Sequence, residues 1–549
     1  MIKSNTPEMR NKDNTRYILA CVLMLILAFI ECFKTVHDLY WASEPDFDRD
    51  IAYIHATLSG HYGQDPNMVG QYMWYNPIIF LLETLSVKLS GAPINVVVAR
   101  AGAYINLINP IVFFIVMVKL FDYKTALASL LAFAFVLSGN LPCWGSPTYS
   151  PWLISDTAIQ FLFYLAIFCC YKAFETQKWV WFVILGAVTG LTFLGHSAPA
   201  FVIILILVSL QAQKVLIALS EKKYRLIGAY FLQGAATAIP FIIFAFPFLY
   251  YVYGKYHLHF INRIILECAP GIFARRETVT LLKLNVTFAL VISLIGFVWF
   301  YFKFENKVLR KIIWSWLLIT LVMYVYESAV PTLDKKIHFN LPDTIPAFHY
   351  FFYFKALQCI FFGFGFVYLF NLAIQKFEVY FKKKRSVSFY SNLFVAAVLI
   401  YMLVYFPIYR NRYDFTGLRQ AALEKGLEQD KIDVYNFITK SVPADHVMLC
   451  PHGLSLFPVM PTAIKMVSVE TYFSNPYVSY DQREADRVKM LDLLTTATPD
   501  SAKHIFSSYH VNDVLLADSA YQHYKQPSFA TSNVIFHNSS YTMLSFQIK

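Results

Sequence analysis

Long apolar runs recur along most of the chain, and each is close to the length that crosses a bilayer. A transmembrane helix needs about 20 consecutive, mostly apolar residues. Such runs predict about eleven spans, at roughly 17–40, 94–119, 124–141, 153–172, 179–195, 197–214, 226–252, 280–302, 310–327, 350–373 and 391–409. The pattern therefore predicts a polytopic α-helical membrane protein.

The composition agrees with this pattern. Of the 549 residues, 57% are hydrophobic and 15% are charged, and the mean hydropathy is +0.48. Soluble domains have about 45–50% apolar and about 25% charged residues.

Lysine and arginine define the predicted orientation, because cytoplasmic loops carry an excess of both. The N-terminal segment is basic, and so is every second connection after it, up to "KKKR" at 382–385. The N-terminus is therefore predicted to lie in the cytoplasm, and an odd number of spans puts the C-terminus outside. These loops account for the formal net charge of +11, so no nucleic-acid partner is expected; such a partner would need a clustered basic face.

The tail differs from the rest of the chain. Residues 411–549 are more polar and mix helical patterns (417–442, 481–495) with strand-like runs such as "HVMLC", "VNDVLLA" and "YTMLSFQI". We expect a transmembrane domain over 1–410 and a small extracytoplasmic α/β domain over 411–549.

The first outer loop, 41–93, carries two amphipathic patterns. One predicts a helix that starts after Asp48 and stops at Gly60. In the second, Asn76 is the predicted N-cap, Pro77 takes the first helical position and Gly91 ends the helix. Two such helices beside a span are expected to lie in the membrane interface.

Several short motifs of this loop carry a family resemblance. An acidic "PDFDRD" follows a long first span, "Y-x-x-A-x-L-x-G-x-Y" runs from Tyr53 to Tyr62, and "YNP" opens the second helix. This order resembles the C-type (GT-C) membrane glycosyltransferases, above all the members that use polyprenyl-phosphate mannose. It is more loosely similar to lipid-A aminoarabinose transferases and protein O-mannosyltransferases. "GLTFLGHSAPA" (190–200) and "IPAFHYFFYFKAL" (345–357) look like the histidine-bearing outer turns of bacterial members. The chain lacks the Asp-Glu pair of the aminoarabinose-transferase branch, and it has Asn76 before Pro77 where the family has a double proline.

The resemblance implies a reaction on the outer face of a membrane, expected to be the bacterial inner membrane. A hexosyl or pentosyl group leaves a polyprenyl-phosphate donor and joins an acceptor hydroxyl with inversion. The acceptor class stays open among glycan, lipid and protein, and membrane lipid is a further partner. No nucleotide donor is expected.

A hydroxyl acceptor needs a base, and a carboxylate within hydrogen-bond reach can take its proton. Asp46 is the preferred catalytic base and Asp48 is the second candidate. Asp48 at a helix N-cap has a structural alternative, since its oxygen would satisfy free amide groups. Asp50 in the first helical turn would favour the helix dipole.

The leaving phosphate needs positive charge and hydrogen-bond donors. Residues near the outer ends of spans or in outer loops supply the candidates for donor-phosphate or sugar binding: Lys355, His349, Arg275, Arg276, Arg100, His196 and Asp156. Simpler roles stay open for them, because a lysine can snorkel to the interface and a loop arginine is often solvated.

No metal and no other cofactor is expected. A two-carboxylate site could be drawn from Asp46 and Asp48, but a hard cation prefers more oxygen ligands than this loop offers.

Two other function classes remain open on the sequence. A lipid or solute transporter would show paired repeats and broken spans in matching positions. No such symmetry is visible, and the acidic motif lies in a loop instead of mid-membrane. A non-catalytic scaffold would leave the two amphipathic helices unexplained.

Overall fold

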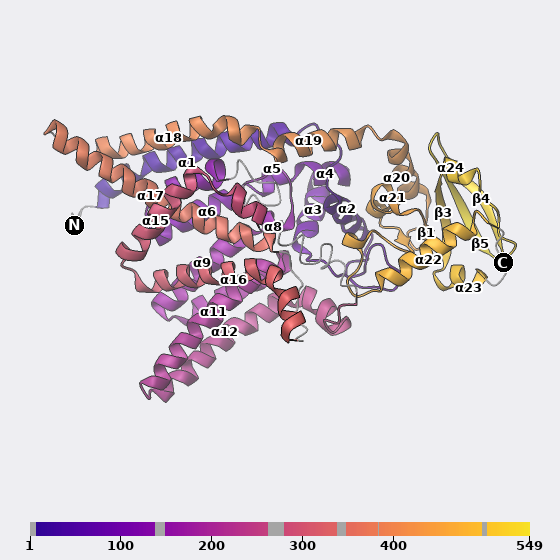
Figure 1. Ribbon diagram of the computed structural model, residues 1–549, viewed down its shortest axis with the longest axis horizontal. Coiled ribbons are helices and arrows are strands. Elements are labelled where there is room, and N and C mark those ends of the chain that lie inside the picture. Colours follow the sequence, from indigo (N-terminus) through magenta and orange to yellow (C-terminus); the bar gives the residue numbers. More distant parts are fainter. Residues whose placement is uncertain (1–6, 138–148, 262–278, 338–346, 383, 497–501) are drawn as a thin grey trace. The chain divides into compact units, whose positions relative to one another are not determined.

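The computed structural model describes residues 7–137, 149–261, 279–337, 347–382, 384–496 and 502–549. The chain forms two compact units, each assembled from separate segments (Figure 1). Unit 1 contains Met1–Asp38, Gly102–Ala245 and Ala269–Gly417, and unit 2 contains Leu39–Ala101, Phe246–Cys268 and Leu418–Lys549. The first outer loop therefore belongs to the same unit as most of the tail. The predicted division of the chain at residue 410 stays a prediction.

Unit 1 is helical. Its principal helices are α1 (Pro7–Val36), α5 (Gly102–Ile105), α6 (Ile108–Leu120), α7 (Tyr123–Leu131), α8 (Ser155–Ala158), α9 (Gln160–Thr176), α10 (Trp179–Gly195), α11 (Ser197–Ser220), α12 (Tyr224–Leu249), α15 (Phe288–Lys303), α16 (Lys307–Ile337), α17 (Phe348–Phe381) and α18 (Val387–Arg410). The helix α12 ends, and α19 (Tyr413–Gly426) begins, at a border between the units.

The predicted spans correspond to helices of this structure. Within the described residues, eight helical stretches are long and apolar enough to cross a membrane. Three shorter apolar helices, Tyr123–Val136, Trp179–Gly195 and Phe288–Lys303, coincide with three further predicted runs. The chain is an integral membrane protein, and the count of eleven spans stays a prediction.

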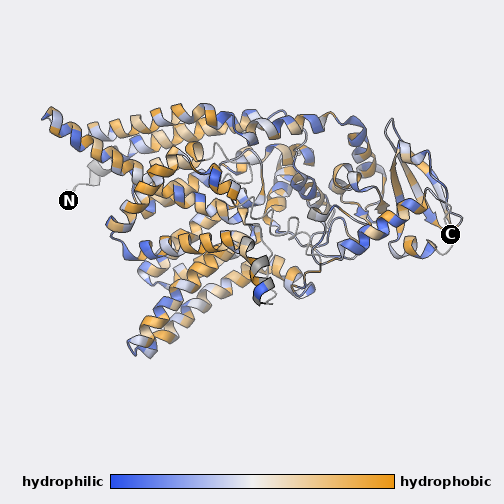
Figure 2. Ribbon diagram, viewed as in Figure 1, coloured by the Kyte–Doolittle hydropathy of each residue, from blue (hydrophilic) through white to orange (hydrophobic). Residues whose placement is uncertain are grey.

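These helices consist mostly of apolar residues, as Figure 2 shows for α11, α12 and α18. On α12 alone, Phe231, Leu232, Ile242 and Ile243 are each more than half exposed. Soluble monomers rarely expose contiguous apolar patches of this kind, so lipid is the solvent that these side chains require.

Glycine permits the close approach of α15 and α17, which pack together. A Cβ atom on Gly296 would lie 1.8 Å from the Phe361 carbonyl oxygen, and one on Gly365 would lie 2.0 Å from that of Ile292. Small residues at such contacts allow membrane helices to pack backbone against backbone.

Unit 2 combines a sheet with short helices. Its helices are α2 (Pro45–Leu58), α3 (Ile78–Ser90), α4 (Ile94–Arg100), α20 (Gln429–Ser441), α21 (His452–Leu454), α22 (Tyr480–Leu493), α23 (Lys503–Ser508) and α24 (Asp518–Tyr521). Its strands are β1 (Val447–Leu449), β2 (Lys465–Met466), β3 (Val511–Ala517), β4 (Ala530–His537) and β5 (Tyr541–Ile548). The sheet order is β2-β1-β3-β5-β4, with β1 parallel to β2 and β3 and the remaining pairs antiparallel.

Side chains alternate across the sheet and divide its core into two layers. Leu449, Val514 and Leu544 pack on one face with residues of α22 and α23. Met448, Leu515 and Met543 pack on the other face with residues of α20 and with Met68 from the first outer loop. The predicted α/β nature of the tail is confirmed, and the loop contributes to its core.

The two helices of the outer loop differ in their surroundings. Most of α2 is buried within unit 2, including Phe47, Ile51 and Ile54, so protein covers most of its surface, and its expected place at the membrane interface stays a prediction. In α3, by contrast, Leu85 and Leu89 are 51% and 78% exposed. This leucine-bearing face of α3 suits a lipid surface, and its interfacial position stays a prediction.

Candidate functional site

The acidic stretch forms the start of α2. Pro45 occupies the first helical position and Glu44 is the N-cap, although its side chain makes no capping hydrogen bond. Asp46 and Asp48 lie in the first turn, where a carboxylate favours the helix dipole, and Asp50 follows in the second turn. The expected cap at Asp48 and the first-turn position of Asp50 are therefore wrong, because proline starts the helix earlier. In α3 the N-cap is Pro77 instead of the predicted Asn76, while Gly91 ends the helix with φ 67° as expected.

Arg49 lies at the centre of the acidic stretch. One guanidinium nitrogen, Nη1, pairs with Asp46, while Nη2 and Nε donate to Oδ1 of Asp50 at 2.9 and 3.0 Å. The guanidinium also stacks on the Tyr75 ring, 3.5 Å from its centroid. The position of Asp46 is thus fixed by a buried arginine, whose role the sequence reasoning missed. Its spacing of three residues from Asp46 on one helix face is the signal that could have revealed it.

Asp48 has a partner from the distant end of the chain. Lys425, near the end of α19, places its Nζ 2.7 Å from both carboxylate oxygens of Asp48. The same ammonium lies over the rings of Phe457, at 4.6 Å, and Trp41, at 5.9 Å. Burial raises the pKa of Asp48, and the charge of Lys425 partly offsets that effect. Asp48 is therefore a structural ion-pair partner in this arrangement.

Exposure separates the three aspartates. The side chain of Asp46 is 40% exposed, whereas those of Asp48 and Asp50 are each 3% exposed. A substrate hydroxyl needs direct access to its base. Of the three, Asp46 combines a fixed position with an accessible side chain, and a catalytic base needs both.

Two further carboxyl groups are buried behind Arg49. Burial raises the pKa of Asp50 to about 6, against the opposing charge of Arg49. Glu83 of α3 is fully buried, and neither of its oxygens has a hydrogen-bond partner among the described residues. Burial, with the charge of Asp50 next in effect, raises the pKa of Glu83 well above its usual range. The helices α2 and α3 pack together through the stacked rings of Tyr53 and Phe80, 4.7 Å apart.

Unit 1 brings three other predicted site residues together. His196 caps α11, where its Nδ1 accepts from the Ala198 amide at 3.2 Å, and its ring stacks on that of His349 at 4.7 Å. One turn after His349 on α17, Tyr353 lies within electrostatic range of Asp156 of α8. The two histidines form a stacked pair, and Tyr353, which the sequence did not suggest, relates Asp156 electrostatically to the same helix. These four residues are called the polar cluster below.

Lys355 is buried in α17, with 1% of its surface exposed. Its Nζ donates to Oδ1 of Asn285 at 2.5 Å. No carboxylate within the described residues forms an ion pair with it. An ionisable side chain at this depth, held by a neutral amide, is a candidate for binding an anionic ligand.

The remaining predicted cations divide into two cases. Arg100 donates from Nε to the Leu39 carbonyl oxygen at 2.8 Å, so it ties α4 to the segment that follows α1. Arg275 and Arg276 lie outside the described residues. For all three, a role in binding phosphate stays a prediction.

The carboxylates of α2 do not form a set that suits a divalent cation. The oxygens of Asp46 and Asp50 are engaged by Arg49, and both oxygens of Asp48 are engaged by Lys425. Within the described part of the chain, no group of three or more His, Cys, Asp or Glu side chains could hold a metal ion. A hard cation would require several of these oxygens at once.

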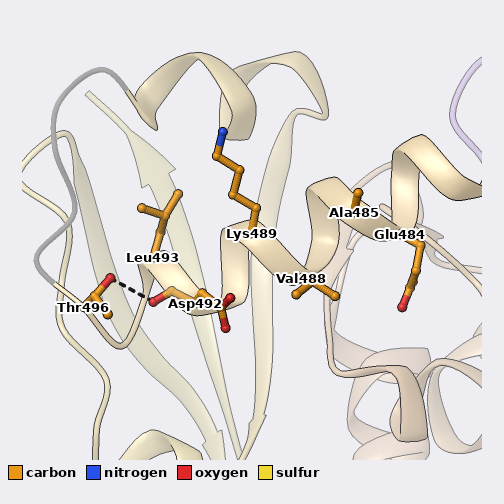
Figure 3. A pocket seen from close by; sticks show the side chains of 7 residues that line it. All are labelled: Glu484, Ala485, Val488, Lys489, Asp492, Leu493 and Thr496. Atoms are coloured by element: carbon orange, nitrogen blue, oxygen red, sulfur yellow. Dashed lines mark hydrogen bonds between the residues drawn. The ribbon is translucent and has the colours of Figure 1, made fainter.

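A groove of about 480 Å³ elsewhere in unit 2 has a different character. Figure 3 shows that its lining residues, from Glu484 to Thr496, come from successive turns of α22 and from the turn that follows it. Its carboxylate Glu484 is already bound by Arg487, and none of the predicted site residues lines it. We do not regard it as the reaction site.

Comparisons with known proteins concern the fold. No protein-family model matches the sequence, and no curated protein does. Among solved structures, the apo state of ArnT from Cupriavidus metallidurans is similar with a TM-score of 0.54 and 13% identity, over 95% of this chain and 97% of that chain. The structure of the same protein bound to undecaprenyl phosphate is similar with a TM-score of 0.53 and 12% identity, over the same shares of the two chains. The apo oligosaccharyltransferase of Archaeoglobus fulgidus is similar with a TM-score of 0.52 and 11% identity, over 90% of this chain and 69% of that chain. These matches confirm the fold class predicted from the sequence.

Proposed function

We propose that this chain, which has the GT-C fold of ArnT and of the archaeal oligosaccharyltransferase, is an inverting glycosyltransferase. It moves a sugar from a polyprenyl-phosphate donor to an acceptor hydroxyl on the non-cytoplasmic face of the bacterial inner membrane. The observation that carries the proposal is the carboxylate of Asp46, which is open on one face and held by the buried Arg49 on the other. One of the similar structures has undecaprenyl phosphate bound, which is a lipid phosphate of the donor class.

In this reaction Asp46 is the base. The acceptor oxygen attacks the anomeric carbon from the side opposite the phosphate, and its proton passes to Asp46. The bond between the anomeric carbon and the phosphate oxygen breaks, and polyprenyl phosphate leaves with the bonding electrons. Arg49 fixes the carboxylate in position, so the proton transfer needs little reorganisation.

The phosphate requires cations, and we assign this role first to Lys355. Phosphate leaves readily once its charge is stabilised. The amino group of Lys355, which is held by the Asn285 amide oxygen and has no carboxylate partner among the described residues, can supply that stabilisation. The polar cluster of His196, His349, Asp156 and Tyr353 supplies hydrogen bonds to sugar hydroxyls or phosphate oxygens. Arg100, Arg275 and Arg276 are further candidates. No step of this mechanism uses a metal.

The test is transfer by Asp46→Asn in membranes supplied with radiolabelled polyprenyl-phosphate sugars. General-base catalysis contributes about 10²–10⁴-fold, so we expect a loss of this order. Asp38→Asn is the matched control, because the side chain of Asp38 is similarly exposed, at 45%, and it should transfer normally.

Two outcomes would contradict the assignment. Normal transfer by Asp46→Asn together with no transfer by Asp48→Asn would move the base to Asp48. Normal transfer by both variants would exclude a carboxylate base in this stretch.

A further inference from the structure

A cavity of about 500 Å³ opens at the opposite end of α2 from Asp46. Three parts of unit 2 line it: residues 55–64 of the outer loop, residues 438–445 of α20 and the turn after it, and residues 462–465 before and within β2. Its size falls within the roughly 300–1,000 Å³ that is typical of small-molecule sites. Neither the reaction chemistry above nor the resemblance assigns a role to it.

The lining combines an apolar floor with a polar rim. Ala56, Ile438 and Ile464 are buried at the floor. The rim carries hydroxyl groups of Ser59, Thr439 and Thr462, the amide of Gln64 and the carboxylate of Asp445. Sugars present the same two surfaces, because apolar C–H groups lie on the ring faces and hydroxyl groups surround the ring edge.

The charges of the cavity favour a neutral ligand over a phosphate. Lys465 directs its ammonium to the carbonyl oxygens of Asp65 and Pro66, at 2.6 and 3.1 Å, and its pKa is lowered by burial. His55 is hydrogen-bonded to the Tyr435 hydroxyl at 3.1 Å, and burial lowers its pKa to about 4. The imidazole of His55 is therefore neutral at pH 7.

The wall formed by the outer loop is preformed. Asp65 accepts hydrogen bonds from the amides of Asn67 and Met68 and from the side chain of Asn475. Asn67 in turn donates to the carbonyl oxygens of Met460 and Ile464, both at 3.1 Å. A site that is already ordered loses less conformational entropy on binding.

The length of α2 relates the cavity to the base. Thirteen residues separate Asp46 from Ser59, which corresponds to about 20 Å at 1.5 Å per residue. A single sugar in the cavity cannot reach Asp46, whereas an oligosaccharide of several units spans that distance.

We propose that this cavity binds a neutral oligosaccharide, the part of the acceptor that lies several sugar units from the reacting hydroxyl. The acceptor assignment rests on the proposed function, while saccharide binding itself does not.

The experiment measures binding of the full chain in detergent to an array of neutral oligosaccharides of two to six hexose units. Thr439→Trp fills the cavity from an exposed position, and Asp445→Asn removes the carboxylate from another exposed position. Lys440→Trp is the matched control, because it adds the same ring at the next, exposed position of α20, which does not line the cavity. We expect the wild type to bind at least one array member, Thr439→Trp to bind it at least tenfold more weakly, and Asp445→Asn to be weakened too. Lys440→Trp should bind as the wild type does.

Each other result overturns part of the inference. Absence of binding by the wild type, equal binding by Thr439→Trp, or binding only of anionic glycans or of peptides would exclude a neutral saccharide site. Asp46→Asn separates this inference from the proposed function, since it should lose transfer yet keep saccharide binding. If Asp46→Asn transfers normally while Thr439→Trp loses binding, the proposed base is wrong and the saccharide site stands.

Discussion

The Nζ of Lys425 lies 2.7 Å from both carboxylate oxygens of Asp48, although 377 residues separate them in the sequence. The lysine and aspartate side chains are 10% and 3% exposed. Each group therefore compensates most of the buried charge of the other. Asp48 lies on α2 within one turn of the proposed base, Asp46.

Removing one member of this pair should destabilise unit 2. Loss of one partner of a buried ion pair costs about 3–5 kcal/mol, so we expect that effect from Lys425→Met in thermal or denaturant unfolding. Lys440→Met is the control. Because this position is exposed, the substitution should change the free energy of unfolding by no more than about 0.5 kcal/mol. The double variant Asp48→Leu/Lys425→Met should be less destabilised than the sum of the single variants, and strict additivity would show that the pair does not interact.

Asp50 should make the stability of unit 2 depend on pH. Its pKa is about 6 in the folded chain and 3.8 ordinarily. Between these values the folded state binds more protons than the unfolded state, so this contribution to stability falls as pH rises from about 4 to about 6 and is constant above. The melting temperature of the wild type should accordingly rise as pH is lowered from 7 to 5, and the melting temperature of Asp50→Asn should rise less.

The comparison requires melting curves of both proteins at pH 5, 6 and 7. Arg49, Asp46 and Glu83 face Asp50, so the wild-type profile also contains their titration, and the difference between the two proteins isolates Asp50. A difference that is the same at pH 5 and pH 7 would contradict the prediction.

Glu83 should be a site where an apolar residue stabilises the fold. Leaving a buried polar group without hydrogen bonds costs about 1–3 kcal/mol, and both oxygens of Glu83 lack such partners among the described residues. Glu83→Met has a similar volume and should raise the melting temperature. Glu83→Ala, which leaves a cavity, is the contrasting variant and should lower it. A fall for both variants would mean that the carboxyl group makes a stabilising interaction.

Transfer should withstand chelation. Arg49 and Lys425 engage the oxygens of the three aspartates of α2, and these oxygens would otherwise bind a cation. We expect the transfer rate in membranes to be unchanged by EDTA and by subsequent addition of Mg²⁺, Mn²⁺ or Zn²⁺. Loss of transfer with EDTA and recovery with one of these ions would show that a cation replaces the pairs described here.

Local patterns in the sequence predicted much of this fold. The apolar runs correspond to helices, and the strand-like runs "HVMLC", "VNDVLLA" and "YTMLSFQI" contain β1, β3 and β5. These features depend on periodicity within a single segment. The helix starts were less accurate, because the N-cap positions at Glu44 and Pro77 depend on backbone geometry beside a proline.

The site was less accessible to such reasoning. Asp46 was recognisable as a candidate, but the structural role of Asp48 depends on its ion pair with Lys425, which comes from the far end of the chain. The sequence does not contain that proximity in any local pattern. Arg49 binds Asp46 and Asp50 on the same helix, and its spacing from Asp46 was the local signal for that role.

The separation of Asp48 and Lys425 along the chain also concerns how the protein is made. Translation proceeds at about 5–20 residues per second, so about 20–75 s pass between the synthesis of these two residues. During that interval the first outer loop lacks its counter-ion, and Met68 lacks the strands against which it packs. The segment that carries the proposed base therefore completes its fold among the last events of biogenesis, and a nascent chain that is truncated before the tail has no assembled site.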